Sequence, residues 1–188
     1  MKKNIAIFAS GEGTNAQSII DYFKQSTLAD VKLIVSNNPK ANVLNRAKQF
    51  GVDTFIINRN SFYESDYVIK KLKNNNIDLI VLAGFLWMIP ENLVNAFPDQ
   101  VVNIHPALLP KYGGKGMYGM NVHKAVIENK EKESGVSIHY INEHYDEGKI
   151  ISQHRCHISE NETPETLAEK IHLLEQAFFA KTIEKLFL

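Results

Sequence analysis

Residues 5–15 read IAIFASGEGTN, and this stretch indicates the fold class. The apolar run Ile5–Ala9 predicts a buried strand that passes through a glycine-rich turn into an amphipathic helix, which Thr14 or Asn15 is expected to cap. Glycines let the backbone approach an anion closely, and a helix N-terminus offers unpaired N–H groups, so this order of elements can cradle a phosphate. The turn has neither the third glycine of a dinucleotide-binding motif nor the lysine of a Walker A loop. Taken alone, it is equally typical of an ordinary tight turn.

The alternation of strand and helix continues along the chain. Further strands are expected at residues 31–36, 54–57 and 78–83, and helices at residues 42–50, 61–76, 91–97 and 121–129. Strands that are apolar throughout and alternate with helices indicate a doubly wound, mostly parallel α/β sheet of the Rossmann-like type. The strands expected at 135–141 and 149–157 are joined by too few residues for a crossover helix. We therefore expect an antiparallel C-terminal strand pair, followed by a closing helix within 160–188.

A second stretch, residues 101–110, reads VVNIHPALLP and carries candidate site residues. Its apolar start predicts a strand that the prolines end, which puts Asn103 and His105 at the carboxyl end of that strand. Residues two apart on a strand point the same way, so an amide and an imidazole would face one point and could hold a polarised carbonyl. In isolation, the stretch is also typical of a structural strand end with a turn-forming asparagine.

Two loops are expected to border the same site. Residues 84–90 follow the strand at 78–83, beyond the sheet edge where open α/β folds bind ligands. Their aromatic and aliphatic side chains, which include the only tryptophan, would either wall a pocket for a flat ring or pack the next helix. Residues 111–120 contain four glycines, which predicts a mobile loop or lid.

The composition restricts the classes of function. Of the 188 residues, 44% are hydrophobic, which suffices for one domain with a sizeable core. Lysine plus arginine and aspartate plus glutamate number 21 each, so no net field would attract nucleic acid or an anionic membrane. The single cysteine, Cys156, excludes an internal disulfide framework, and the N-terminal apolar run is too short for a signal peptide. We expect a cytoplasmic protein, a monomer or homodimer, that binds small molecules and neither nucleic acid nor membranes.

Three features converge on one family: the SGEGTN turn at residues 10–15, the NIHP segment at 103–106 and the DEG loop at 146–148. Together with the AGF segment at 83–85 and the LLP segment at 108–110, they closely resemble the glycinamide ribonucleotide formyltransferases over essentially the whole chain. The NIHP segment with a downstream aspartate is specific for the wider group of folate formyltransferases and deformylases. The N-terminal turn narrows the resemblance to the ribonucleotide enzymes.

In that family, a formyl group carried by a folate is moved to the primary amine of a purine precursor. The resemblance implies 10-formyltetrahydrofolate as co-substrate, no metal, and Asn103, His105 and Asp146 as the catalytic group. Attack of the amine creates a tetrahedral centre with an oxyanion, to which Asn103 can donate a hydrogen bond. His105 can donate to the same oxygen or carry a proton between nitrogens. Asp146 can stabilise the imidazolium or accept the amine proton through a water.

The resemblance also implies two binding subsites within a single domain, residues 1–188, whose halves 1–100 and 101–188 serve nucleotide binding and catalysis with folate binding. The ribonucleotide subsite comprises the turn that would hold the phosphate and a glutamate for the ribose hydroxyls: Gly11, Glu12, Gly13, Thr14, Asn15 and Glu175. The folate subsite comprises two loops that would wall the pterin: Phe85, Leu86, Trp87, Met88, Ile89, Tyr140, Ile141, Asn142, Glu143 and Asp146. Ser137 and His139, on the strand that leads to this second loop, are expected to be supporting residues.

Three positions depart from the usual pattern of the family. Trp87 stands where an arginine is frequent, the glycine-rich loop Gly113–Gly119 replaces a Pro-Gly pair, and Lys149 stands where a proline is common. These departures concern how the folate tail is held and how the loop closes, not the reaction. Trp87 is expected to stack on a ligand or to cover the site.

Other functions would use some of the same candidate residues. A hydrolase that releases formate from formyl-folate would use the same asparagine, histidine and aspartate, but it has no need of the phosphate turn and commonly carries a regulatory domain. Formyl transfer to initiator methionyl-tRNA would call for a basic surface and usually a further C-terminal domain. A catalytically silent nucleotide- or folate-binding module would not need all three catalytic side chains.

The remaining histidines give weaker signals. His154 and Cys156 share a strand face, but two potential ligands without a further clustered pair favour a structural role over a metal site. No function is assigned to four others: His123, His144, His157 and His172.

Overall fold

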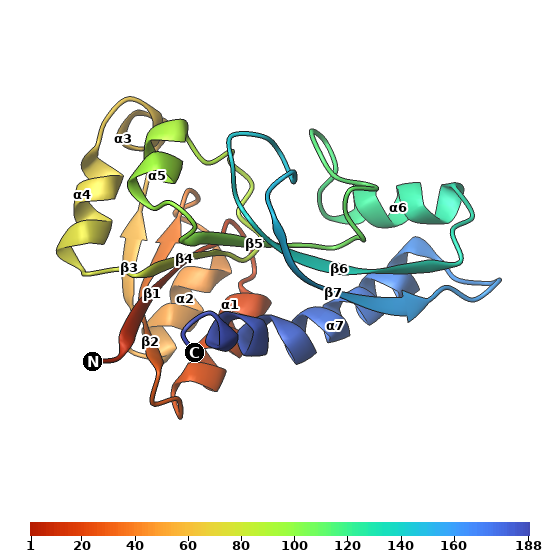
Figure 1. Ribbon diagram of the computed structural model, residues 1–188, viewed down its shortest axis with the longest axis horizontal. Coiled ribbons are helices and arrows are strands. Elements are labelled where there is room, and N and C mark those ends of the chain that lie inside the picture. Colours follow the sequence, from red (N-terminus) through yellow and green to blue (C-terminus); the bar gives the residue numbers. More distant parts are fainter.

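The opening strand, β1 (Lys3–Phe8), lies within a seven-stranded sheet in the computed structural model, which describes residues 1–188. The strand order is β3-β2-β1-β4-β5-β6-β7 (Figure 1). The other strands are β2 (Ala29–Ser36), β3 (Asp53–Ile56), β4 (Leu79–Leu82), β5 (Val101–His105), β6 (Glu133–Tyr140) and β7 (Ile150–His157). The helices are α1 (Thr14–Phe23), α2 (Asn42–Gln49), α3 (Arg59–Tyr63), α4 (Tyr67–Asn74), α5 (Glu91–Ala96), α6 (Met120–Glu128) and α7 (Pro164–Lys185).

The sheet is mixed, and its parallel part carries the predicted doubly wound topology. Strands β1 to β5 are parallel, whereas β6 pairs antiparallel with both β5 and β7. The fold class and the antiparallel C-terminal pair are therefore confirmed. Strand order reverses between β1 and β4, and open α/β sheets bind ligands beyond the carboxyl ends of the strands at such a point. The turn after β1, the loop after β4 and the end of β5 all lie there.

Two apolar cores cover the two faces of the sheet, and the side chains of β1 alternate between them. Ile5 and Ile7 belong to the core with α1, α2, α6 and α7, while Ala6 and Phe8 belong to the core with α3, α4 and α5. All four side chains are fully buried, because successive residues of a central strand point to opposite faces that are both covered. Figure 1 shows α3, α4 and α5 grouped at one end of the sheet and α7 running along β6 and β7.

One predicted helix is wrong in its extent. Residues 61–76 do not form a single helix, because α3 and α4 are separate elements. Asn58 caps α3 through a capping box with Ser61, whose amide donates to the Asn58 side chain at 2.8 Å, so α3 begins earlier than expected. The Ser65 hydroxyl accepts from the Tyr67 amide at 3.3 Å, at the start of α4. The apolar periodicity runs across the break because both helices pack into the same core.

Candidate active site

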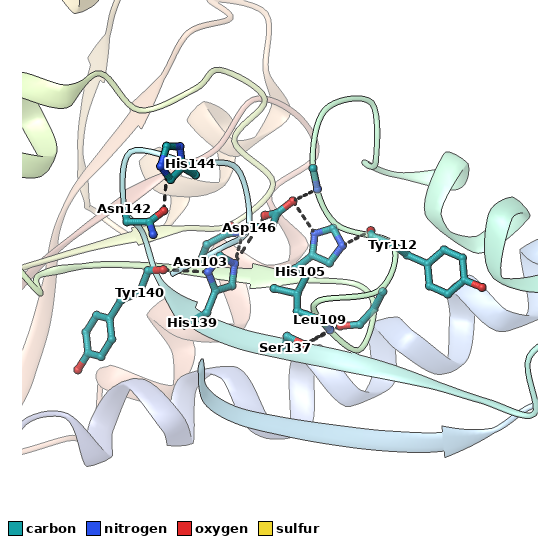
Figure 2. Close-up of polar contacts among 12 residues, drawn as sticks. Asn103, His105, Leu109, Tyr112, Ser137, His139, Tyr140, Asn142, His144 and Asp146 are labelled. Carbon is teal, nitrogen blue, oxygen red and sulfur yellow. Dashed lines mark hydrogen bonds and ion pairs between the residues drawn. The ribbon is translucent and has the colours of Figure 1, made fainter. Parts of the chain in front are cut away.

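The end of β5 and the loop after β6 bring the three expected catalytic side chains together. Asn103, His105 and Asp146 lie close together (Figure 2). All three line one cavity of about 540 Å³. Nδ1 of His105 lies 3.6 Å from Oδ2 of Asp146, and Nε2 of His139 lies 3.7 Å from Oδ1 of the same carboxylate. The cavity has the volume of a site for a small organic ligand.

A backbone carbonyl fixes the tautomer of His105. This side chain is only 4% exposed, and its Nε2 lies 2.7 Å from the carbonyl oxygen of Tyr112. A carbonyl oxygen only accepts, so Nε2 carries the hydrogen and donates it. In the neutral ring, Nδ1 is then an acceptor, and Nδ1 is the nitrogen nearest to Asp146. A proton that arrives at Nδ1 would therefore form an imidazolium beside a carboxylate.

The two partners of His105 both have left-handed backbone conformations. The φ angle is 58° at Tyr112 and 55° at Asp146, a conformation that costs a non-glycine residue about 1–3 kcal/mol. Contacts with neighbouring backbone hold the aspartate loop in this state. Oδ2 of Asp146 accepts from the Gly114 amide at 2.9 Å, and a Cβ on Gly148 would lie 1.7 Å from the Tyr140 carbonyl oxygen. Only glycine allows this close approach, so the loop backbone positions the carboxylate.

A second histidine, His139, orients the amide of Asn103. The two residues are paired across β5 and β6, and Nδ2 of Asn103 lies 3.1 Å from Nε2 of His139. Nδ1 of His139 lies 2.9 Å from the Tyr140 carbonyl oxygen, so it donates there and leaves Nε2 to accept from Asn103. Desolvation lowers the pKa of His139, which is fully buried, against the opposing effects of this backbone bond and of Asp146. The ring is thus held neutral, and Asn103 keeps a second N–H for a ligand.

Ser137 contacts the loop after β5 and does not line the cavity. Its hydroxyl accepts from the Leu109 amide at 2.9 Å and donates to the Ala107 carbonyl at 2.7 Å. Gln153 of β7 donates to the same oxygen at 2.9 Å. These bonds fix the chain that leads from β5 to Tyr112, which fits the expected supporting role of Ser137 without testing it.

The turn after β1 leaves the N-terminus of α1 without a side-chain cap. The N-cap residue is Gly13, so the prediction that Thr14 or Asn15 caps the helix is wrong: both already lie in its first turn. Gly13 has a φ of 74°, and a Cβ there would lie 2.5 Å from Cγ2 of Val43, so both conformation and space require glycine. The unpaired N–H groups and the helix dipole at this end can bind an anion.

Contacts on both sides hold this turn in place. On the α2 side, the Val43 amide donates to the Gly11 carbonyl at 3.1 Å, and Nε of Arg46 donates to the Glu12 carbonyl at 2.7 Å. On the β4 side, the Ser10 hydroxyl accepts from the Leu86 amide at 2.9 Å. The turn and the loop after β4 are therefore joined across the crevice.

Asn15 and Glu175 meet although 160 positions separate them in the sequence. Nδ2 of Asn15 donates to Oε2 of Glu175 at 2.8 Å, and Nδ1 of His172 lies 3.3 Å from the same oxygen. The hydrogen bond with Glu175 raises the pKa of His172 above its ordinary value, although desolvation opposes the shift. All three side chains line the cavity that also contains Asn103, His105 and Asp146. This end of the cavity offers a carboxylate that two neighbours orient.

The loop after β4 forms an apolar wall of the cavity. Leu86 is 63% exposed and so available to a ligand. Trp87 also lines the cavity, and its ring centroid lies 5.9 Å from those of Phe62 and Tyr63. The Arg59 guanidinium lies 5.1 Å from the indole centroid, within the range of a cation–π contact. Trp87, which stands where the family often has an arginine, thus packs against α3 and connects that helix to the cavity wall.

The cavity collects many of the predicted binding residues, but not all. Those that line it, besides the three expected catalytic residues, are Asn15, Phe85, Leu86, Trp87, Met88, Ile89, Ile141, Asn142 and Glu175. Those outside its lining are Gly11, Glu12, Gly13, Thr14, Tyr140 and Glu143. The first four of these belong to the turn that leads to Asn15, and Tyr140 contributes its carbonyl to His139 instead.

Two helices supply lining residues to which the sequence assigned no function. Ala168, Ile171 and His172 of α7 line the cavity together with Glu175, at spacings of three and four that place them on one helix face. This spacing is a signal that could have identified His172. His123 of α6 also lines the cavity, and no local pattern links that helix to the others.

His154 and Cys156, the two potential metal ligands considered in the sequence, lie away from the cavity. The His154 ring stacks on Phe178, with centroids 3.7 Å apart and an interplanar angle of 6°, and Cys156 is a half-buried thiol. The structure contains no cluster of three or more histidine, cysteine, aspartate or glutamate side chains able to hold a metal ion. None of its helices is both long and apolar enough to span a membrane.

Similarity to known proteins extends over nearly the whole chain. A family model described as formyl transferase matches residues 3–183. The chloroplastic phosphoribosylglycinamide formyltransferase of Arabidopsis thaliana is 36% identical over 97% of this chain, which spans only 64% of that relative's length. The phosphoribosylglycinamide formyltransferase of Bacillus subtilis is 33% identical, with 98% of this chain and 94% of the relative covered. The crystal structure of phosphoribosylglycinamide formyltransferase from Bacillus halodurans has a TM-score of 0.87 at 37% identity, covering 98% of this chain and 95% of the other.

Proposed function

The chain belongs to the formyl transferase family, and from this we propose that it transfers the formyl group of 10-formyltetrahydrofolate to the primary amine of glycinamide ribonucleotide, a step of de novo purine biosynthesis. One observation carries the proposal. Asn103, His105 and Asp146 line the same cavity as Asn15, which follows the uncapped turn at the N-terminus of α1. A polar reaction centre and an anion site thus belong to one ligand-sized space. The relatives are named as phosphoribosylglycinamide formyltransferases, which supports this acceptor and the transfer of a formyl group.

The end of the cavity that contains Asn15 and Glu175 suits two parts of the ribonucleotide. The N–H groups at the start of α1 would bind the phosphate, and Glu175 would accept hydrogen bonds from the ribose hydroxyls. Oδ1 of Asn15 is buried without a hydrogen-bond partner in the protein, which fits a polar ligand group at this point. The apolar loop that includes Leu86 and Trp87 would lie against the folate ring system.

10-Formyltetrahydrofolate supplies the electrophilic formyl carbon. Attack by the amine places negative charge on the formyl oxygen, where a fixed donor lowers the barrier. Asn103 supplies this donor: one amide hydrogen is bonded to His139, and the second is left for the oxygen. Because the neutral imidazole of His139 only accepts at Nε2, the amide group is held with its nitrogen in the donor position.

His105 would take the proton that the amine loses and return it to N10 of the folate, as the bond between N10 and the formyl carbon breaks and tetrahydrofolate leaves. Its Nε2–H is engaged by the Tyr112 carbonyl, so Nδ1 is the basic nitrogen, and the resulting imidazolium would face Asp146 at 3.6 Å. Asp146 then stabilises the charged ring without itself being protonated. This arrangement favours proton transfer over oxyanion binding as the function of His105, because Nε2–H already donates to Tyr112 and Nδ1 of the neutral ring carries no hydrogen to donate to the oxyanion.

The experiment that tests the function also separates it from its nearest rival. A hydrolase of formyl-folate would use water in place of the amine at the same three residues. Purified protein is incubated with 10-formyltetrahydrofolate, with and without glycinamide ribonucleotide, and the release of tetrahydrofolate is followed. Release that requires the amine, with formylated ribonucleotide formed in equal amount, establishes the transferase. Equal release without the amine would identify a hydrolase instead.

A further inference from the structure

His123 is a buried polar side chain in the cavity with no partner in the protein. It lies on α6, is 6% exposed and lines the cavity. Its Nδ1 is inaccessible to solvent and has no hydrogen-bond partner. Its neighbours on the helix, Val122 and Val126, pack into the apolar core, so packing alone would be met by a leucine at this position. Because His123 makes no side-chain hydrogen bond within the protein and its Nδ1 is enclosed, Nε2 is the ring nitrogen left for a hydrogen bond with a ligand in the cavity.

His123 lines the same cavity as Glu175 and His105, the residues at the two ends of the proposed ribonucleotide path. Desolvation lowers the pKa of His123, the Glu175 carboxylate opposes this shift, and His105 adds to it. Glu175 would hold the ribose, and His105 would receive the amine proton. Between the ribose and the amine, glycinamide ribonucleotide has one polar group, the amide that joins the sugar to the amine-bearing carbon.

We propose that His123 binds this linking amide of the substrate by a hydrogen bond. A neutral imidazole has one donor and one acceptor nitrogen, which matches an uncharged amide group. His123 is then the residue that distinguishes the amide-bearing ribonucleotide from other sugar phosphates. The inference rests on the proposed function and adds a contact to the same site.

Two ligands distinguish a contact of His123 with the amide from a contact with the sugar. Glycinamide ribonucleotide carries phosphate, ribose and amide, whereas ribose 5-phosphate carries no amide. Isothermal titration calorimetry with each ligand is compared for the parent, His123→Leu and a matched control, His157→Leu, which alters an exposed histidine outside the cavity. We expect His123→Leu to raise the dissociation constant of glycinamide ribonucleotide about 10-fold, the effect of one lost hydrogen bond. The dissociation constant of ribose 5-phosphate should stay within about 2-fold of the parent value.

Two further variants test whether the hydrogen bond itself is responsible. Asparagine places an amide near the position of Nδ1 of His123 and glutamine near that of Nε2, so at least one of His123→Asn and His123→Gln should recover most of the affinity lost in His123→Leu. Equal weakening of both ligands would assign His123 to the sugar, and unchanged affinity for both would give it no ligand contact. Either result overturns the inference. A parent protein that binds ribose 5-phosphate but neither binds nor formylates glycinamide ribonucleotide would instead refute the proposed function.

Discussion

Asn103 and His139 face each other across β5 and β6, with the amide nitrogen 3.1 Å from Nε2 of the imidazole. The buried histidine has its other nitrogen on the Tyr140 carbonyl, so it can only accept from the asparagine. A residue that does not touch the reacting atoms thereby determines which way the proposed oxyanion donor points. His139 is in this sense a positioning residue, and its removal should affect the chemical step more than binding.

Replacing His139 by leucine should lower kcat by about 10-fold, because one hydrogen bond that orients the Asn103 amide is lost. The KM values for the amine and the formyl-folate should change by less than about 3-fold. Steady-state kinetics of His139→Leu beside Asn103→Ala checks this, and the asparagine variant should lose about 100-fold or more, as the loss of an oxyanion donor predicts. If His139→Leu changed both KM values and left kcat intact, the orienting role would be wrong.

Asp146→Asn should reduce kcat by about 100-fold or more and leave the dissociation constant of glycinamide ribonucleotide within about 3-fold. Asparagine can still accept the Gly114 N–H, so the loop keeps its anchor, but the neutral amide no longer stabilises an imidazolium at His105. Single-turnover kinetics and titration calorimetry measure the two quantities. Glu147→Gln, which neutralises the adjacent exposed carboxylate, is the matched control and should be active. Near-normal turnover of the Asp146 variant would remove the proposed part of Asp146 in proton transfer.

Gly13→Ala should destabilise the protein and weaken the binding of the phosphorylated substrate. Gly51→Ala separates the two causes of the lost stability, the left-handed backbone conformation and the overlap with Val43. Both glycines have positive φ, 74° and 68°, but a Cβ would strike Val43 only at residue 13. The left-handed conformation should cost about 1–2 kcal/mol in each variant, with about 1–3 kcal/mol more at residue 13 from overlap. Urea unfolding and substrate titration are the measurements. An equal loss of unfolding free energy in the two variants would show that Val43 moves away from the added Cβ at no cost in stability.

Sequence patterns identified the layers of this fold because each depends on local periodicity. The apolar strands, the glycine turn and the antiparallel end follow from runs of residues that are read one segment at a time. The Asn103 and His105 pair followed from the two-residue period of a strand, and Asp146 was reached only through resemblance to a family. The prediction of the residue that caps α1 was wrong because it considered only which side chains favour an N-cap. The N-cap position here has a positive φ, which favours Gly13.

The contacts that the sequence did not predict all join elements that are distant in the chain. The bond between Asn103 and His139 depends on the register of β5 with β6, and the bond between Asn15 and Glu175 depends on how α7 crosses α1. The inclusion of His123 in the cavity depends on the packing of α6 against α7. Such contacts are set by tertiary packing, which local patterns do not encode.

Acid should destabilise the fold below about pH 6.5 through its desolvated histidines. Desolvation lowers the folded-state pKa of His123, His139 and His154, with Lys185 adding to the shift at the last. The unfolded chain then binds more protons than the native one as pH falls below the ordinary histidine value of about 6.5. Stability is therefore full above that pH and declines below it. His172, whose pKa is raised, contributes in the opposite sense and loses its contribution as pH rises.

His154 allows this to be tested away from the cavity. Its ring lies flat on Phe178, so His154→Phe keeps an aromatic stack while it removes the titrating nitrogen. Urea unfolding at pH 7.5 and pH 5.5 should show that the variant loses less stability on acidification than the parent, with similar stability at pH 7.5. An equal loss in both proteins would mean that His154 takes up its proton in the native state as readily as in the unfolded one, and that its burial against α7 has no acid-sensitive consequence.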